Sequence, residues 1–432
     1  MLYNPSRLLV RGGRRGEEQG MDGRSCDGGR QGPRLTRRLR REFYRAFGPP
    51  TFPLFMAAGG WLLKSVGPHI PFIRFARPDR FSYHLPPVKS RAYERFYRNI
   101  VNRGLGRDWG PHAVTIAVTH DCNARCVHCS AFRRSREGTL TTGEWCRVID
   151  QCAELGITDI IITGGEPLLR PDLDVLIRRI VENDCVADLF TNGSLLTEEN
   201  LERLTRAGCD TIFVSLDSPV PEEHDRLRGV PGLYDRVMEG VQRAVERGMH
   251  VGLSTYMSRE WVRRGYHHDF LALCKELGVR ELTVFDLVPT GRCLKQDELI
   301  LTDAEREVFR VLHEEQWKDF RGPRVCMMCH VNDPHIMGCF GVKWQIHITH
   351  NGFVTPCDFT PLHFGNVKEE SLWDIWHRMK VHPEYDRKAM TCRMQDPEFR
   401  RKYIHKIPEG AELPFPIYEV DEEHRSAGCA FP

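Results

Sequence analysis

Residues 122–129 read Cys-Asn-Ala-Arg-Cys-Val-His-Cys, so three cysteines are separated by three and then by two residues. The stretch follows a β-branched run at Val114–Val118, and ligand sites of βα folds gather where strands end. Iron–sulfur clusters are held by cysteine thiolates, four being usual when the cluster only carries electrons. Three local thiols therefore predict a cluster with one iron open to a substrate or cofactor. A zinc knuckle or three unrelated thiols are the alternatives, because short motifs carry false positives.

Outward from this loop, the spacing of hydrophobic residues over 113–289 alternates between a helical pattern and a strand pattern. Segments of helical period, such as Asp172–Glu182, separate short runs rich in β-branched residues. This alternation is typical of βα units around a parallel sheet, so the sequence predicts an α/β fold. The runs predict six strands, at Val114–Val118, Asp159–Ile162, Ala187–Phe190, Thr211–Leu216, His250–Tyr256 and Glu281–Leu287.

Polar motifs follow the second, third and fourth predicted strands. They are Gly164-Gly165-Glu166-Pro167, Thr191-Asn192-Gly193 and Ser215-Leu216-Asp217. A glycine pair lets backbone groups approach a ligand without a Cβ in the way. The Glu166 carboxylate can accept a charge-assisted hydrogen bond from an ammonium group. Asn192-Gly193 alone is an ordinary turn signal. Further on, the planar fork of Arg228 suits a carboxylate.

In this order, the cysteine loop and the motifs resemble the radical S-adenosylmethionine (SAM) superfamily, over about residues 114–289. The resemblance implies a partial (β/α)6 barrel and a [4Fe-4S] cluster on Cys122, Cys126 and Cys129 that binds S-adenosyl-L-methionine. It also implies reductive cleavage of this cofactor to a 5′-deoxyadenosyl radical, with electrons from an external flavodoxin- or ferredoxin-like donor. The residues that it assigns to the cofactor pocket are His128, Gly164, Gly165, Glu166, Pro167, Asn192, Ser215, Asp217, Arg228 and Ser254.

The resemblance also implies roles within that pocket. The family places the residue before the last cysteine, here His128, near the adenine, and the Gly164–Pro167 element at the methionine amino group. Arg228 matches an Arg that lies near the cofactor carboxylate. Ser215 and Asp217 are expected at the ribose or the substrate. No catalytic residue is predicted.

A second set of cysteines follows residue 289. Gly352 lies between Cys339 and Cys357 and suits a hairpin turn that would bring the two thiols to one site. The stretch resembles the opening of SPASM/twitch domains, and this implies one auxiliary [4Fe-4S] cluster on Cys339, Cys357 and Cys392. Cys326 and Cys329 are tentative further ligands, with zinc binding and free thiols as alternatives.

Four domains are predicted along the chain. An arm over 1–45 holds twelve Arg against five acidic residues and is expected to be disordered, with Met21 as an alternative start. An aromatic extension over 46–110 faces a membrane or packs as a lid or brace. The barrel occupies 111–295 and the auxiliary cluster domain, of α+β type, 296–432.

Charge and hydropathy restrict the remaining possibilities. No run of about 20 apolar residues and no secretory signal are seen, which predicts a cytoplasmic protein, or one peripheral to the inner face of the membrane. A net charge of +2 gives no reason to expect a nucleic-acid partner. The leading hypothesis is a radical enzyme that abstracts hydrogen from an unactivated carbon of a lipid, another hydrophobic small molecule or a peptide. The alternative is a non-catalytic iron–sulfur or zinc protein with a binding or regulatory role.

Overall fold

The computed structural model describes residues 86, 90–105, 107, 109–132, 135, 138–308, 323–328, 338–389 and 391–424. The predicted arm over 1–45 lies outside these residues, as does most of the extension over 46–110. The domain boundaries and the membrane contact therefore remain predictions. Within the described ranges, no helix is both long and apolar enough to cross a membrane.

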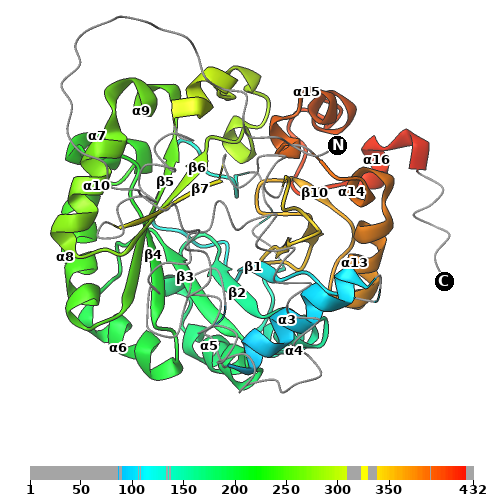
Figure 1. The fold of residues 1–432 in the computed structure, drawn as a ribbon, viewed down its shortest axis with the longest axis horizontal. Coiled ribbons are helices and arrows are strands. Elements are labelled where there is room, and N and C mark those ends of the chain that lie inside the picture. The colour runs from blue at the N-terminus through cyan, green and yellow to red at the C-terminus, as the bar shows by residue number, and fades with distance from the viewer. Residues whose placement is uncertain are drawn as a thin grey trace, which may run out of the picture. The chain divides into compact units, whose positions relative to one another are not determined.

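A curved, mainly parallel sheet organises the described chain, and the helices between its strands lie along its outer side (Figure 1). It has nine strands in the order β7-β6-β5-β4-β3-β2-β1-β8-β9 and is not closed. All neighbouring pairs are parallel except β8 and β9. The strands are β1 Ala113–Ala117, β2 Asp159–Thr163, β3 Val186–Thr191, β4 Thr211–Ser215, β5 His250–Met257, β6 Glu281–Asp286, β7 Arg324–Met327, β8 Gln345–Ile348 and β9 Val354–Thr355.

The six predicted strands are confirmed to within one residue at each end. They form because both faces of the sheet are covered, so near-continuous apolar runs such as β1 are buried along their whole length. The outer face packs on the apolar stripes of the helices, as Leu173, Leu176 and Ile177 of α5 show. The helices of this part are α4 Thr142–Glu154, α5 Leu173–Glu182, α6 Glu198–Ala207, α7 Pro221–Arg228, α8 Leu233–Glu246, α9 Arg259–Arg264 and α10 Tyr266–Leu277.

The predicted hairpin between Cys339 and Cys357 is also confirmed. Strands β8 and β9 are antiparallel, and Gly352 in their turn has φ +96°, a left-handed conformation that favours glycine. The sequence did not predict that β8 also pairs in parallel with β1, or that β7 pairs with β6. Strands from beyond residue 295 thus extend the same sheet at both edges.

The C-terminal part adds a two-stranded sheet and several short helices. Its elements are β10 Leu362–His363, β11 Phe415–Pro416, α13 Leu372–Val381, α14 Pro383–Asp386, α15 Pro397–Phe399 and α16 Ile417–Val420. The buried Arg400 ties it to the loop after β6, because its guanidinium donates to the carbonyls of Pro289 at 3.1 Å and Leu294 at 2.6 Å. Trp376 and Tyr385 are buried in the core of this part.

Helix α3, Arg91–Gly104, is the described part of the predicted N-terminal extension. Asn99 donates to the carbonyl of Gly156, just before β2, and Arg95 donates to the carbonyl of Asn183, just before β3. The ring of Phe96 contacts that of His112, just before β1, at a centroid distance of 4.6 Å. Helix α3 therefore braces the amino ends of the strands, the side opposite the predicted site.

Candidate functional site

The cysteine loop after β1 is anchored on the end of α7. The backbone N–H groups of Arg125 and Val127 donate to the carbonyls of Arg228 at 2.8 Å and Leu227 at 3.0 Å. Gly229 follows with φ +66°, and a Cβ there would lie 3.0 Å from the carbonyl oxygen of Arg125. The loop that carries the three thiols is thus fixed by a helix end about 100 residues further along the chain.

The three thiols of this loop lie close enough to repel one another as thiolates. Burial raises the pKa of Cys122 to about 11, and the neighbouring Cys126 and Cys129 add to the rise. Burial likewise raises the pKa of Cys126. Converging thiols with raised pKa values become ligands when a cation compensates their charge, as the iron of a cluster does. The donor set therefore fits the predicted [4Fe-4S] cluster.

The glycine pair after β2 packs against the start of the cysteine loop. A Cβ on Gly165 would lie 2.1 Å from the carbonyl oxygen of Asp121, and one on Gly164 would lie 2.5 Å from that of Thr119. The N–H of Gly165 donates to Thr119 and that of Glu166 to Asp121. The pair is therefore needed for contact between two loops of the protein, in addition to the cofactor contact that the sequence suggests.

Glu166 is fully buried between the ends of β2 and β3. Its carboxylate accepts hydrogen bonds from the Thr191 hydroxyl and from the backbone N–H groups of Asn192 and Leu168. Burial raises the pKa of Glu166, and these three donors partly offset the rise. A carboxylate offers about four acceptor positions, so one remains for the ammonium group that the resemblance predicts.

Asn192 joins the end of β3 to the cysteine loop. Its side-chain amide donates to the Asn123 side chain at 2.8 Å, and Asn123 donates in turn to the Ser194 hydroxyl. The backbone N–H of Ser194 donates back to the Asn192 side chain, so the three residues form a closed ring of hydrogen bonds. Asn192 thus positions the loop as well as lining the predicted pocket, and sequence reasoning had no signal for Asn123.

Asp217 and Arg228 form a buried ion pair beside the cluster thiols. The Arg228 Nε and Nη2 atoms lie 2.5 and 2.7 Å from the two carboxylate oxygens of Asp217. Burial raises the pKa of Asp217, but Arg228 and His128 outweigh this and hold it below its usual range. The Nη1 atom of Arg228 donates to the Cys126 sulfur at 3.7 Å. Two predicted cofactor residues are therefore bound to each other and to a predicted iron ligand.

His128 lies against Tyr256 of β5, with ring centroids 4.0 Å apart. Ser215, at the end of β4, is paired in register with Ser254, in the middle of β5, so the structure brings these two predicted residues together. Tyr256 lies two residues beyond Ser254 on the same face of β5. Sequence reasoning missed Tyr256, although this period-two spacing was the signal that would have found it.

The second set of cysteines also converges. Burial raises the pKa of Cys357 to about 12, with Cys339 as the next cause, and burial followed by Cys339 and Cys357 raises that of Cys392. The three thiols thus form a second fitting donor set. Cys326 lies on β7 opposite Thr283, and Cys329 lies outside the described residues.

One short segment after β6 reaches both cysteine sites. Asp286 ends β6, and its carboxylate accepts from the side-chain amide of Gln395, three residues after Cys392, at 3.1 Å. Six residues later, the N–H of Arg292 donates to the carbonyl of Cys129 at 3.0 Å. Gly291 has φ +52°, and a Cβ there would lie 2.2 Å from the same carbonyl oxygen. Residues 286–293, which we call the linking segment, therefore connect the two sets of thiols.

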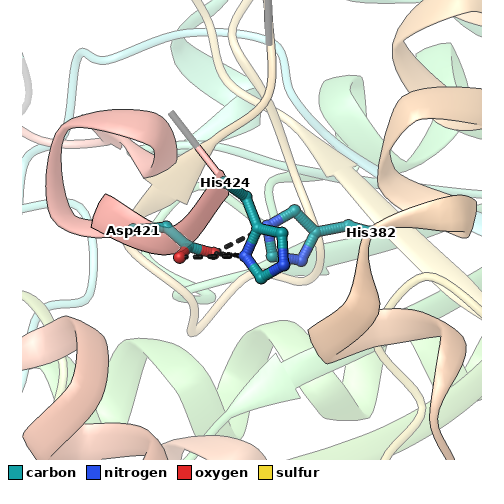
Figure 2. Close-up of side chains that lie close together, drawn as sticks. All are labelled: His382, Asp421 and His424. Atoms are coloured by element: carbon teal, nitrogen blue, oxygen red, sulfur yellow. Dashed lines mark hydrogen bonds and ion pairs between the residues drawn. The ribbon is translucent and has the colours of Figure 1, made fainter. Parts of the chain in front are cut away.

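A third polar group, His382, Asp421 and His424, lies in the C-terminal part (Figure 2). Asp421 is 3.1 Å from a ring nitrogen of each histidine. The N–H of Glu384 donates to His382 Nδ1, and burial lowers the pKa of His382 to about 4, so its one ring proton lies on Nε2. Because a metal would need the Nε2 lone pair, this tautomer suits a polar network that ties residues 421–424 to α14.

Comparison with known proteins identifies two family regions. The Radical SAM superfamily matches residues 116–260, and the iron-sulfur cluster-binding domain SPASM matches residues 339–401. An AdoMet-dependent heme synthase of Methanosarcina barkeri is 31% identical over 298 residues, covering 63% of this chain and 83% of the relative. A PqqA peptide cyclase of Gluconobacter oxydans is 30% identical over 283 residues, covering 62% and 76%.

The fold has solved counterparts. Streptococcus suis SuiB bound to S-adenosylmethionine superposes with a TM-score of 0.53 at 18% identity, over 67% of this chain and 70% of that chain. The two family regions contain the two converging sets of thiols, Cys122 to Cys129 and Cys339 to Cys392. The chain therefore belongs to the radical SAM superfamily, as an enzyme that uses S-adenosylmethionine with a [4Fe-4S] cluster and carries an auxiliary iron–sulfur cluster in a SPASM domain.

Proposed function

We propose that the enzyme abstracts hydrogen from an unactivated carbon of a substrate held between two clusters. The first is bound by Cys122, Cys126 and Cys129, and the auxiliary one by Cys339, Cys357 and Cys392. The observation that carries this proposal is the linking segment, residues 286–293, which donates to the carbonyl of Cys129 and, through Asp286, accepts from Gln395, three residues after Cys392. A substrate that rests on this segment would be near both clusters.

The protein's own residues prepare this reaction. When bound, the cluster and S-adenosylmethionine supply a 5′-deoxyadenosyl radical, with electrons from an external flavodoxin- or ferredoxin-like donor. Glu166 keeps an acceptor position for the methionine ammonium group, and Ser215 and Ser254 offer hydroxyl groups at paired positions of adjacent strands.

A hydrophobic small molecule of the tetrapyrrole class is our first candidate substrate. Heme synthases at 27–31% identity are among the relatives, and the chain covers 78–86% of them. Aromatic rings face the inner side of the sheet, where Phe190 stacks on Phe213 at 4.6 Å and Phe285 contacts Phe359 at 5.9 Å. Phe285 precedes the linking segment and Phe359 follows Cys357 by two residues, so the second pair joins the end of β6 to the auxiliary thiol set. Such rings suit a flat apolar ligand.

A peptide is the second candidate. PqqA peptide cyclases are 28–30% identical to the chain over 62–66% of its length. The SuiB structures support only the fold, because their identity is 17–18%. The two candidates predict stimulation of 5′-deoxyadenosine formation by different added substrates, so one assay distinguishes them.

The test is anaerobic purification, iron and sulfide analysis, and incubation with dithionite and S-adenosylmethionine. We expect 5′-deoxyadenosine to form, faster with an iron coproporphyrin than without it, or faster with a short peptide encoded beside the gene. Cys126→Ala should abolish formation, whereas Cys146→Ala, a half-buried thiol on α4, should not. A protein with its full complement of iron that forms no 5′-deoxyadenosine would be the non-catalytic alternative.

A further inference from the structure

The Arg228 guanidinium has two kinds of partner. Its Nε and Nη2 atoms pair with both oxygens of Asp217 at 2.5 and 2.7 Å, and Nη1 donates to the Cys126 sulfur at 3.7 Å. The Asp217 side chain is completely buried, and 12% of that of Arg228 is exposed. Nη2 donates to Oδ1, while Nε lies beside Oδ2 without a hydrogen bond, so two contacts to one carboxylate hold the guanidinium plane and direct Nη1 toward the sulfur.

Two histidines contact Asp217 and fix its position. Its backbone N–H donates to His224 Nδ1 at 3.2 Å, and His128 Nε2 lies 3.7 Å from its Oδ2 atom. The carbonyl of Arg228 accepts from the N–H of Arg125 in the cysteine loop. The arginine is thus bound to the loop at its backbone and at its side chain, and the N–H···S contact has little freedom to change.

Hydrogen bonds to sulfur and local charge are two of the factors that set the reduction potential of an iron–sulfur cluster. Reduction adds negative charge, so a cation and an N–H donor at a ligand sulfur favour the reduced form. The Asp217 carboxylate opposes this effect in part, because it carries the opposite charge next to the same arginine.

We propose that Arg228, oriented by Asp217, is a positioning residue that raises the reduction potential of the SAM-binding cluster through the Cys126 sulfur. The inference rests on the proposed function, since it takes Cys126 as a ligand of that cluster. It is compatible with a contact to the cofactor carboxylate. A guanidinium has five N–H groups, and the hydrogen bonds to Asp217 and Cys126 use two of them.

The experiment is a reductive titration of the full-length, anaerobically reconstituted enzyme, followed by electron paramagnetic resonance. Addition of S-adenosylmethionine identifies the signal of the first cluster, because that cluster lies in the radical SAM region and is the one that binds this cofactor. Arg228→Met removes the donor and the positive charge and should lower the one-electron reduction constant at least tenfold, about 59 mV. Asp217→Asn keeps the shape but removes the opposing charge and should shift the potential in the opposite direction.

Two further variants distinguish an effect of Arg228 on the reduction potential from a purely structural role of this residue. Arg228→Lys keeps a charged donor and should recover more than half of the shift. Arg292→Met is the matched control. Arg292 also lies beside the cysteine loop, but its guanidinium stacks on the Phe132 ring at 4.0 Å, so its loss should change the reduction constant less than threefold.

Opposite shifts for Arg228→Met and Asp217→Asn, with iron content unchanged, support the inference. Potentials that stay within threefold of the wild type in both variants overturn it. If Arg228→Met fails to retain a cluster, the reduction potential of the isosteric Asp217→Asn variant is the test. A potential within threefold of the wild type in that variant also overturns the inference. A wild-type protein without any signal that responds to S-adenosylmethionine would instead defeat the proposed function.

Discussion

The Glu166 carboxylate accepts the backbone N–H of Asn192 at 2.8 Å, which binds the end of β2 to the end of β3. Glu166→Gln replaces one carboxylate oxygen by an NH2 group that would face an N–H donor. We expect a loss of about 1–3 kcal/mol in the free energy of unfolding, measured with urea, because a buried donor is left unsatisfied.

The matched control for this change is Glu202→Gln on α6. Glu202 pairs with Arg206 at the surface, so its substitution should cost less than about 0.5 kcal/mol. Equal costs for the two variants would show that Glu166 does not hold the strand ends together.

Gly165→Ala should prevent correct assembly of the cysteine loop. The new Cβ would lie 2.1 Å from the carbonyl oxygen of Asp121, a backbone atom that can move only with the loop. We expect reduced iron incorporation after reconstitution and a stability loss of about 1–3 kcal/mol. Gly143→Ala is the control, since the nearest atom to its Cβ is the Arg147 side chain at 3.9 Å. Full iron content in Gly165→Ala would contradict the conclusion that Gly165 packs too closely on the Asp121 carbonyl to carry a Cβ.

The two thiol sets should load iron independently. Replacing Cys122, Cys126 and Cys129 together by Ala should leave about four irons per chain, bound at the auxiliary site. The triple change at Cys339, Cys357 and Cys392 should likewise leave about four. Iron and sulfide analysis after anaerobic reconstitution measures both. If the protein without Cys122, Cys126 and Cys129 bound no iron, the prediction of an auxiliary cluster on the second thiol set would be wrong.

The buried His382 should make stability depend on pH. Burial lowers its pKa to about 4, below the value of about 6.5 in an unfolded chain. Between these values the unfolded state binds more protons, so stability falls as the pH falls from 6.5 to 4, by about 3 kcal/mol in full. His382→Asn keeps an acceptor for the N–H of Glu384 but cannot titrate. Its unfolding free energy, measured across this range, should therefore decrease less steeply than that of the wild type. The same slope of unfolding free energy against pH in His382→Asn and in the wild type would contradict the prediction.

Much of the fold follows from local patterns in the sequence. The six strands were predictable because each is a short apolar run between segments of helical period, and the hairpin because Gly352 marks its turn. The pairing of β8 with β1 was not predictable, since a strand of four residues carries no local signal for its partner. The choice is made by tertiary packing, which one sequence does not display.

The same limit applies to the site. The thiol spacing and the motif order identified the residues that converge, but the relations among them depend on folding. Neither the contact of Arg228 with Cys126 nor the approach of Gly165 to Asp121 has a local signature, because each joins residues of different βα units. Tyr256 was overlooked for a different reason: one aromatic residue in a strand is usually interpreted as core.

Strand β1 lies between β2 and β8, and both neighbours follow it in the sequence, the second more than 200 residues downstream. During synthesis, one edge of β1 therefore stays without its native partner until residues 345–348 leave the ribosome. An uncovered strand edge invites pairing with other chains. The cysteine loop is attached to the end of this strand, so insertion of iron should be completed only after release of the C-terminal part. Chains truncated before residue 345 should accumulate as aggregates rather than as loaded barrels.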